Sequence, residues 1–191
     1  MKIVLLLSGG MDSAALYAHA AAEGHQVTPL FIDYSQPSVL EEVESAERIA
    51  EHFGSVLIVR ASTLSLQDMG AQDGVSGPRV VPARNLVFLA LGVHQAIIDQ
   101  ADEVWLGASL DDFEDYLDCR DHFVGAVNSA STLLGVIVRY PFCNRTKSQI
   151  LDTANLYGFD LVDTWSCYSP IRSHPCGSCN GCLERDLLWV E

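Results

Sequence analysis

The sequence predicts a doubly wound α/β fold, in which a parallel sheet carries helices on both faces. Three observations predict it. Short apolar runs alternate with longer amphipathic stretches, the first apolar run ends in a glycine-rich turn, and hydrophobic residues make up 49% of the 191 residues, enough for a sizeable core. We expect one α/β domain over residues 1–160 and a small C-terminal segment over residues 161–191.

Five apolar runs have the length of buried strands. The first of them ends in the Ser-Gly-Gly turn, and each of the first four is followed by a helical stretch before the next strand begins, as parallel pairing requires. The expected strands are Lys2–Leu7, Val27–Ile32, Ser55–Arg60, Glu103–Leu106 and Val136–Arg139.

Five longer stretches are expected to be helical. The first begins just after the Ser-Gly-Gly turn, and the second places apolar residues such as Val43 and Ile49 at helical spacing, with glutamates such as Glu44 and Glu47 facing outward. The expected helices are Asp12–Glu23, Val39–Phe53, Asn85–Gln100, Arg120–Ala130 and Lys147–Tyr157. The longest irregular stretch, Thr63–Val80, contains three glycines and predicts a mobile lid or a disordered segment.

The charge balance excludes some classes of partner. A net charge of −14 argues against a general nucleic-acid binder and against docking on an anionic membrane. No apolar run is long enough to span a bilayer, and no signal peptide is visible at Met1. We therefore expect a cytoplasmic protein without nucleic-acid or membrane partners, whose six cysteines are reduced thiols or metal ligands.

The turn after the first strand has the composition of a phosphate site. Gly9 and Gly10 allow close approach of the backbone to an anion, and the following helix start offers unpaired N–H groups. Ser8 and Ser13 add hydroxyl donors, and Asp12 suits Mg²⁺, which takes oxygen ligands together with phosphate. The pattern predicts a nucleotide site rather than an ordinary glycine-rich corner, and the lack of Gly-Lys-Ser/Thr argues against a γ-phosphate kinase.

Four of the six cysteines lie close together near the C-terminus with the spacing C-x8-C-x2-C-x2-C. They are Cys167, Cys176, Cys179 and Cys182. Four thiolates form a closed tetrahedral Zn²⁺ site, although repeated C-x2-C spacing also occurs in iron–sulfur proteins. Because a four-cysteine zinc site has no open position, we predict that it is structural and clamps the C-terminal tail onto one wall of the site.

The phosphate loop and the cysteine cluster together resemble the 7-cyano-7-deazaguanine synthase family of the PP-loop ATP pyrophosphatase superfamily. The resemblance extends over nearly the whole chain and includes the segments Phe31–Gln36, Val81–Asn85, Gly107–Arg120, Thr146–Lys147, Thr164–Tyr168 and Cys176–Arg185. This chain departs from the family where Ser35 replaces a glycine, where Pro37-Ser38 replaces Arg-His, and where Ser109 replaces an asparagine.

The resemblance implies an ATP-dependent ligase. The family adenylates the carboxylate of 7-carboxy-7-deazaguanine, converts it with ammonia to an amide, and then dehydrates the amide to a nitrile. The departure at Pro37-Ser38 motivates an alternative, a divergent ligase of phage-defence type that joins the deazaguanine to a protein amine. A tRNA thiolase and a nucleotide-binding module without turnover are further alternatives, and a homodimer stays open because family members commonly self-associate.

Residue roles follow from the same resemblance. The ATP and Mg²⁺ ligands are expected to be Ser8, Gly9, Gly10, Asp12, Ser13, Asp33 and Lys147, the deazaguanine ligands Gln36, Asp112, Asp118 and Arg120, and the catalytic residues Asp12, Arg84, Cys119 and Lys147. Lys147 at a helix start fits poorly with the helix dipole, which favours an anion nearby. Structural alternatives remain open for some of these residues. Arg84 could form a structural ion pair, Cys119 could be a buried inert thiol, and Asp112 and Asp118 could belong to a solvated acidic loop.

Overall fold

The computed structural model describes residues 1–61, 80–113, 116–157 and 160–188. The expected lid over residues 63–80 lies, apart from Val80, outside the described residues. Five strands form one parallel sheet in the order β3-β2-β1-β4-β5. They are β1 (Lys2–Leu6), β2 (Gln26–Asp33), β3 (Ile58–Ala61), β4 (Glu103–Leu106) and β5 (Ile137–Arg139).

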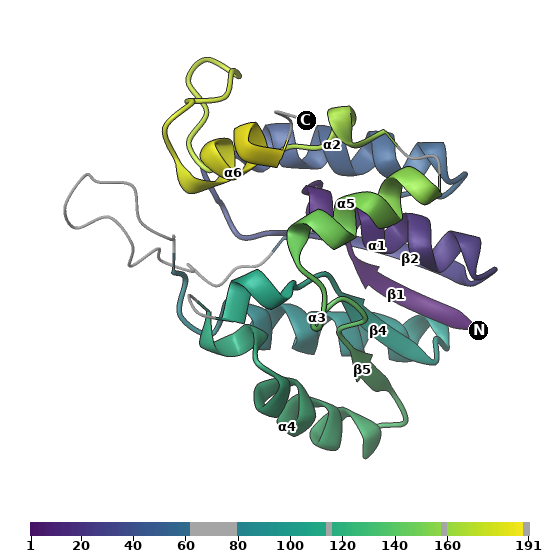
Figure 1. Cartoon of the computed structure of the whole chain (residues 1–191). Helices are drawn as coiled ribbons and strands as arrows, with labels where there is room; N and C mark the ends of the chain where they lie inside the picture. The colour runs from purple at the N-terminus through teal and green to yellow at the C-terminus, as the bar shows by residue number, and fades with distance from the viewer. Residues whose placement is uncertain (62–79, 114–115, 158–159, 189–191) are drawn as a thin grey trace.

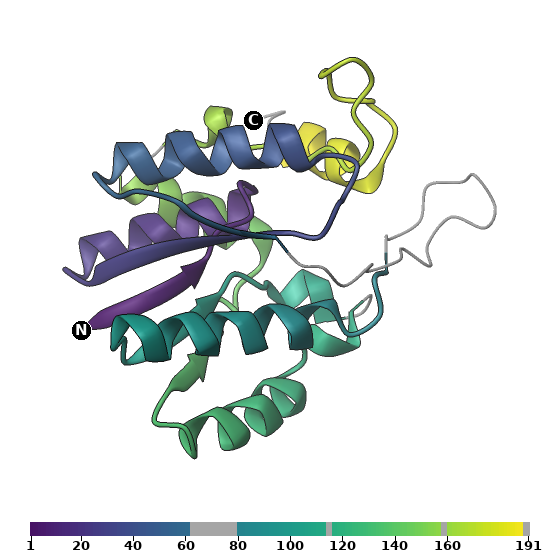
Figure 2. The same cartoon turned by 180° about the vertical axis from the view of Figure 1, so that it is seen from behind.

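Helices cover both faces of the sheet, so the predicted doubly wound fold is confirmed (Figures 1 and 2). The helices are α1 (Met11–Ala22), α2 (Val39–His52), α3 (Arg84–Asp99), α4 (Asp121–Thr132), α5 (Lys147–Leu156) and α6 (Asn180–Leu188). Side chains of β1 alternate between two buried clusters. Ile3 and Leu5 pack with α1, α2 and α5, whereas Val4 and Leu6 pack with α3 and α4.

The structure reproduces all ten expected elements, β4 with the predicted bounds and the others with shifted ends. The largest shift is in β3, which begins at Ile58 rather than Ser55 because the Ser55 N–H still donates to the Ala50 carbonyl at the end of α2. Helix α6 and three short 3-10 helices, Leu110–Phe113, Leu117–Cys119 and Leu161–Asp163, were not expected. Division of the chain at residue 160 stays a prediction. Among the described residues, no helix is long and apolar enough to cross a membrane.

The strand order places the Ser-Gly-Gly loop at the switch point of the sheet, where successive connections run over opposite faces. The connection after β1 runs over one face to β2, whereas β4, on the other side of β1, leads over the opposite face to β5. A crevice forms at such a switch point, beyond the carboxyl ends of the strands. Gly9 turns there with φ of +80°, and a Cβ at this position would overlap the Glu42 carbonyl oxygen, so the tight turn requires glycine.

Candidate active site

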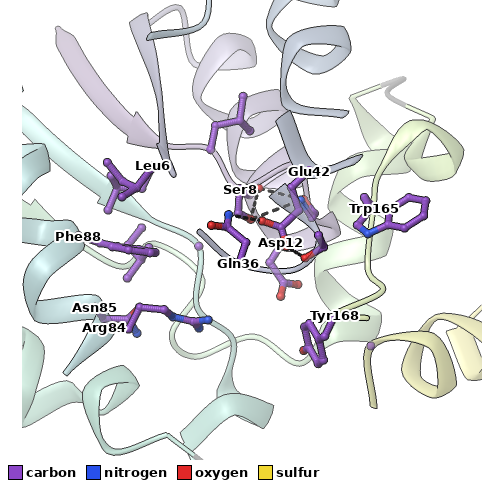
Figure 3. Close-up of a pocket in the computed structure, with 18 of the residues that line it drawn as sticks. Leu6, Ser8, Asp12, Gln36, Glu42, Arg84, Asn85, Phe88, Trp165 and Tyr168 are labelled. Carbon is purple, nitrogen blue, oxygen red and sulfur yellow. Dashed lines mark hydrogen bonds between the residues drawn. The ribbon is translucent and has the colours of Figure 1, made fainter. Parts of the chain in front are cut away.

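A cavity of about 450 Å³ lies at the carboxyl ends of β1, β2 and β4. Figure 3 shows Arg84, Asn85 and Phe88 on one side and Trp165 and Tyr168 across from them, with the phosphate loop between. The sheet, the starts of α1, α3 and α5, and the segment leading into α6 all contribute to its wall. The fold thus brings parts of the sequence as far apart as Leu6 and Glu184 to one cavity.

Most of the residues predicted for the site line this cavity. They are Ser8, Gly10, Asp12, Ser13, Gln36, Arg84, Asp112, Cys119 and Lys147. Four others, Gly9, Asp33, Asp118 and Arg120, lie outside the lining and hold the loops around it. The Asp33 carboxylate accepts from the Ser35 N–H at 2.8 Å, and Arg120 Nε donates to the Phe113 carbonyl at 2.9 Å.

The phosphate loop is held by its own hydroxyl groups. Ser13 Oγ donates to the Gly10 carbonyl at 2.9 Å and lies 3.2 Å from Ser8 Oγ. Gly10 is the N-cap of α1 and provides no side-chain cap, so the first-turn N–H groups have no side-chain acceptor at this end of the helix. Hydroxyl groups, backbone N–H groups and the positive end of the helix dipole therefore converge at the start of α1.

Lys147 faces this loop from the first turn of α5. Its ammonium donates to Glu184 Oε2 at 2.5 Å and lies 3.6 Å from Asp112 Oδ1. Burial lowers the pKa of Lys147, but the nearby carboxylates of Asp112, Asp12 and Glu184 outweigh that effect and raise it. The side chain is 15% exposed and fully charged at neutral pH.

Asp112 is the more rigid of the two carboxylates that pair with Lys147. Its Oδ2 accepts from both the backbone N–H and the hydroxyl of Ser109, each at 2.8 Å. Ser109 is fully buried and stands where the family has an asparagine, so this departure still supplies a donor to the aspartate. The neighbouring Asp111 accepts from the backbone N–H of Lys147 at 2.7 Å and so ties this loop to the start of α5.

Asp12 is held in an environment that favours a cation. Burial and the charge of Asp112 raise the pKa of Asp12 to about 7, while the charge of Lys147 acts in the opposite direction. The carboxylate lines the cavity at the first turn of α1, close to Ser8 (Figure 3), and Ser13 lines the same cavity. Carboxylate and hydroxyl oxygens are the donors that Mg²⁺ accepts, so the residues present fit this ion.

Behind the loop lies a polar network that the sequence did not reveal. Glu42 accepts from Gln36 Nε2 at 2.7 Å and from Ser38 Oγ at 2.6 Å, and burial raises its pKa. Gln36 Oε1 in turn accepts from the Tyr34 N–H at 3.0 Å. Ser38 is one of the departures from the family, and its hydroxyl helps to fix the Glu42 side chain, which in turn orients Gln36.

The side of the cavity that contains Arg84 and Phe88 is aromatic. Arg84 Nη1 donates to the Tyr34 hydroxyl at 3.4 Å, and its guanidinium lies 5.8 Å from the centre of the Phe88 ring. The Tyr34 and Phe88 rings are 5.4 Å apart. Burial lowers the pKa of Arg84, but tyrosines nearby, Tyr34 foremost, raise it overall, so a cation lies beside flat apolar surfaces.

Cys119 borders this aromatic side as a neutral thiol. Burial, together with the charges of Asp112 and Asp118, raises the pKa of Cys119 to about 12. Its sulfur accepts from Asn85 Nδ2 at 3.4 Å. Asp118 Oδ2 accepts from the Asn85 backbone N–H at 3.0 Å and therefore supports the first turn of α3 rather than lining the cavity.

The four cysteines predicted as metal ligands come together. Their sulfur atoms all lie within 4.8 Å of one another, and three of the pairs are 3.6 to 4.0 Å apart. A tetrahedron of thiolates with Zn–S bonds of about 2.3 Å has edges of about 3.8 Å. The Cys176 and Cys179 N–H groups donate to cluster sulfurs at 3.2 and 3.4 Å, as suits thiolates, so this cluster could hold a metal such as zinc.

The cluster segment forms one wall of the cavity. The backbone N–H of Trp165 donates to the Gly9 carbonyl at 2.8 Å, which joins this segment directly to the phosphate loop. Gly181, in the first turn of α6, packs so closely that a Cβ would overlap the Ser166 carbonyl oxygen. Arg185 donates to the Thr164 carbonyl at 2.6 Å and anchors α6 further.

Several cavity residues were absent from the sequence prediction. They are Tyr34, Glu42, Phe88, Tyr116, Trp165, Tyr168 and Glu184. Tyr34, Tyr116, Trp165 and Tyr168 belong to segments that resemble the family, so closer attention to aromatic residues there could have found them. Glu184 also lies in such a segment, Cys176–Arg185, but nothing in its residue type distinguishes it from other acidic residues on a helix. Glu42 carries no such signal, because it is an ordinary acidic residue on a helix.

Comparison with known proteins gives matches over nearly the whole chain. The family model described as "Queuosine biosynthesis protein QueC" matches residues 2–191. A 7-cyano-7-deazaguanine synthase from Synechococcus sp. strain RCC307 is 35% identical, over 98% of this chain and 94% of the relative. The synthase of the same name from Archaeoglobus fulgidus is 33% identical, over 100% of this chain and 86% of the relative.

Solved structures share the fold at low identity. The U34-tRNA thiolase NcsA from Methanococcus maripaludis, solved with its 4Fe-4S cluster, superposes with a TM-score of 0.62 at 14% identity. The match covers 93% of this chain and 62% of that chain. A 4-thiouridine synthetase–RNA complex with bound ATP gives a TM-score of 0.53 at 18% identity, over 97% of this chain and 49% of that chain. At these identities the likeness concerns the fold alone.

Proposed function

Because this chain belongs to the queuosine biosynthesis protein QueC family, we propose that it is an ATP-dependent ligase that converts 7-carboxy-7-deazaguanine and ammonia to 7-cyano-7-deazaguanine. The observation that carries the proposal is the single cavity that joins a phosphate loop, two cations and an aromatic side. Such a cavity suits a nucleotide triphosphate beside a planar base.

A carboxylate needs activation before an amine can displace one of its oxygens. In the proposed reaction a carboxylate oxygen attacks the α-phosphorus of ATP, the bond to the β-phosphate breaks, and pyrophosphate leaves. Ammonia then adds to the acyl carbon and gives up one proton, and AMP departs with that oxygen, which leaves the amide. A second ATP adenylates the amide oxygen, and loss of AMP with the amide protons gives the nitrile.

The protein's part in this chemistry is positioning and charge stabilisation. Ser8, Ser13 and the first-turn N–H groups of α1 bind the departing pyrophosphate, whose negative charge grows as the bond breaks. Lys147, which lines the same cavity, neutralises that charge. Asp12 would hold Mg²⁺, which when bound shields the phosphate oxygens.

The aromatic side is proposed to receive the deazaguanine. Tyr34 and Phe88 offer flat surfaces to a planar ring, and Arg84 places a cation beside them for the substrate carboxylate or the α-phosphate. Gln36, oriented by Glu42, and Asp112 carry polar atoms toward the same cavity and supply hydrogen bonds to the ring.

Zinc is the metal that we propose for the cysteine cluster. The sulfur separations of 3.6 to 4.0 Å suit four ligands on one ion, whereas a four-iron cluster holds its cysteines farther apart because each binds a different iron. All four positions would be occupied by cysteine, so the ion takes no part in the reaction and stabilises the cavity wall.

Mass spectrometry of the reaction tests the proposed function directly. Purified protein is incubated with Mg-ATP and 7-carboxy-7-deazaguanine, with and without ammonia. We expect AMP and, only with ammonia, the nitrile. AMP with a product that stops at the adenylate or the amide would instead favour the divergent ligase, whose acceptor is a protein amine. No AMP under any condition would contradict both versions.

Cys119 provides a separate prediction about mechanism. Since its thiol is neutral in the free protein, we expect Cys119→Ser to keep nitrile formation within about tenfold of the wild-type kcat. The measurement is steady-state kcat. The matched control is Cys143→Ser, which makes the same substitution at a half-buried cysteine outside the cavity. A loss of about 10³-fold or more would establish Cys119 as a covalent nucleophile, as the sequence prediction allowed.

A further inference from the structure

Glu184 lies in the cavity although it belongs to the helix that follows the cysteine cluster. Its carboxylate accepts from the Lys147 ammonium at 2.5 Å, across 37 positions of sequence. The residue is two positions after Cys182, so the location of its carboxylate depends on where the cluster holds α6. A contact of this kind links the metal-binding segment to the phosphate-binding lysine.

The contact is not needed to hold α6 in place. Arg185 donates to the Thr164 carbonyl at 2.6 Å and to the Val162 carbonyl at 3.0 Å, and Gly181 packs directly on Ser166. The cysteine cluster adds further restraint at the start of the helix. The Glu184 side chain is itself 40% exposed, so its pairing adds little to the stability of the fold.

The contact does restrict Lys147. An ammonium group on a four-carbon stem has three donors and many rotamers. Asp112, which is fixed by Ser109, attracts the ammonium from one direction at 3.6 Å, and Glu184 binds it from another. The hydrogen bond to Glu184 occupies one donor, and the other N–H groups remain for phosphate oxygens. The charge of Asp12 interacts with that of Lys147, but the Asp12 carboxylate has no hydrogen bond and no ion pair within 4.0 Å among the described residues, so its oxygens remain available to a cation.

We propose that Glu184 is a positioning residue that holds the Lys147 ammonium in place for the pyrophosphate of ATP and leaves Asp12 to the metal ion. The proposal deepens the proposed function, since it rests on Lys147 acting on the phosphates of ATP. It also gives the cysteine cluster an indirect role in the reaction, because the cluster holds the helix that carries Glu184.

A double-mutant cycle tests this proposal. The proteins are wild type, Glu184→Gln, Lys147→Met and the double variant, with Asp186→Asn as the matched control, because Asp186 lies on the same helix outside the cavity lining. The measurements are the Kd of Mg-pyrophosphate by calorimetry, which needs no turnover, and kcat and KM for AMP formation. Thermal melts check that all five proteins are folded.

We expect Glu184→Gln to weaken Mg-pyrophosphate and lower kcat by about fivefold to tenfold, and to have no further effect when Lys147 is already methionine. Asp186→Asn should match wild type. Equal effects of Glu184→Gln in both backgrounds, or tighter pyrophosphate binding, would overturn the proposal, as would a wild-type protein that does not bind Mg-pyrophosphate. If pyrophosphate binds but no AMP forms from 7-carboxy-7-deazaguanine, the proposed function fails while the cycle still decides the role of Glu184.

Discussion

Replacing Lys147 with methionine is expected to lower kcat for AMP formation by about 10²–10³-fold. The substitution keeps the length of the side chain but removes the ammonium that faces the phosphate loop. It also leaves Asp112 and Glu184 without their shared cation, so the site becomes more negative where the proposed reaction releases pyrophosphate. The measurement is single-turnover formation of AMP at saturating Mg-ATP, which separates chemistry from binding.

The chain provides a matched control for this experiment. Lys2, the other lysine, is exposed at the start of β1, at the opposite end of the strand from the phosphate loop. Lys2→Met removes the same charge and should leave AMP formation unchanged. Lys147→Arg should recover only part of the activity, because a planar guanidinium does not occupy the place of a compact ammonium. Wild-type turnover by Lys147→Met would show that the lysine has no role in the chemistry.

Replacing Cys179 with serine is expected to abolish metal binding. The Cys179 sulfur lies 3.6 Å from that of Cys182 and 4.0 Å from that of Cys167, so its loss opens the tetrahedron. Structural zinc contributes an apparent free energy of about 10–16 kcal/mol in small peptides, and part of that stabilisation should disappear here. Each kcal/mol lost lowers the Tm of a chain of this size by about 2–4 °C.

Metal content and stability measured together decide this prediction. Elemental analysis should find about one zinc per wild-type chain and nearly none in Cys179→Ser, and the melting curve should shift downward. The affinity for Mg-ATP should fall as well, since Trp165 and Glu184 line the cavity from this segment. Cys143→Ser should keep zinc and Tm unchanged. Iron and sulfide in the purified wild-type protein would establish an iron–sulfur cluster instead.

The order of strands and helices could be predicted because it depends on local patterns. Apolar runs and helical spacing mark each element within the residues that form it, and glycines mark the turn after β1. Helix α6 escaped prediction because it is short, contains a glycine and a cysteine, and is held by tertiary contacts with Thr164 and Ser166. The stability of α6 therefore depends on these tertiary contacts and cannot be predicted from its own composition.

The site divides in the same way. The sequence by itself determined the Ser-Gly-Gly loop and the cluster of four cysteines that could hold a metal, because their spacing within one short segment already imposes the geometry. Only the tertiary structure decided that Glu42 and Glu184 reach the cavity, that Asp118 instead supports α3, and that Cys119 is a neutral thiol. Those properties depend on distances and burial between segments far apart in the chain, and pairing, desolvation and charge all act through space.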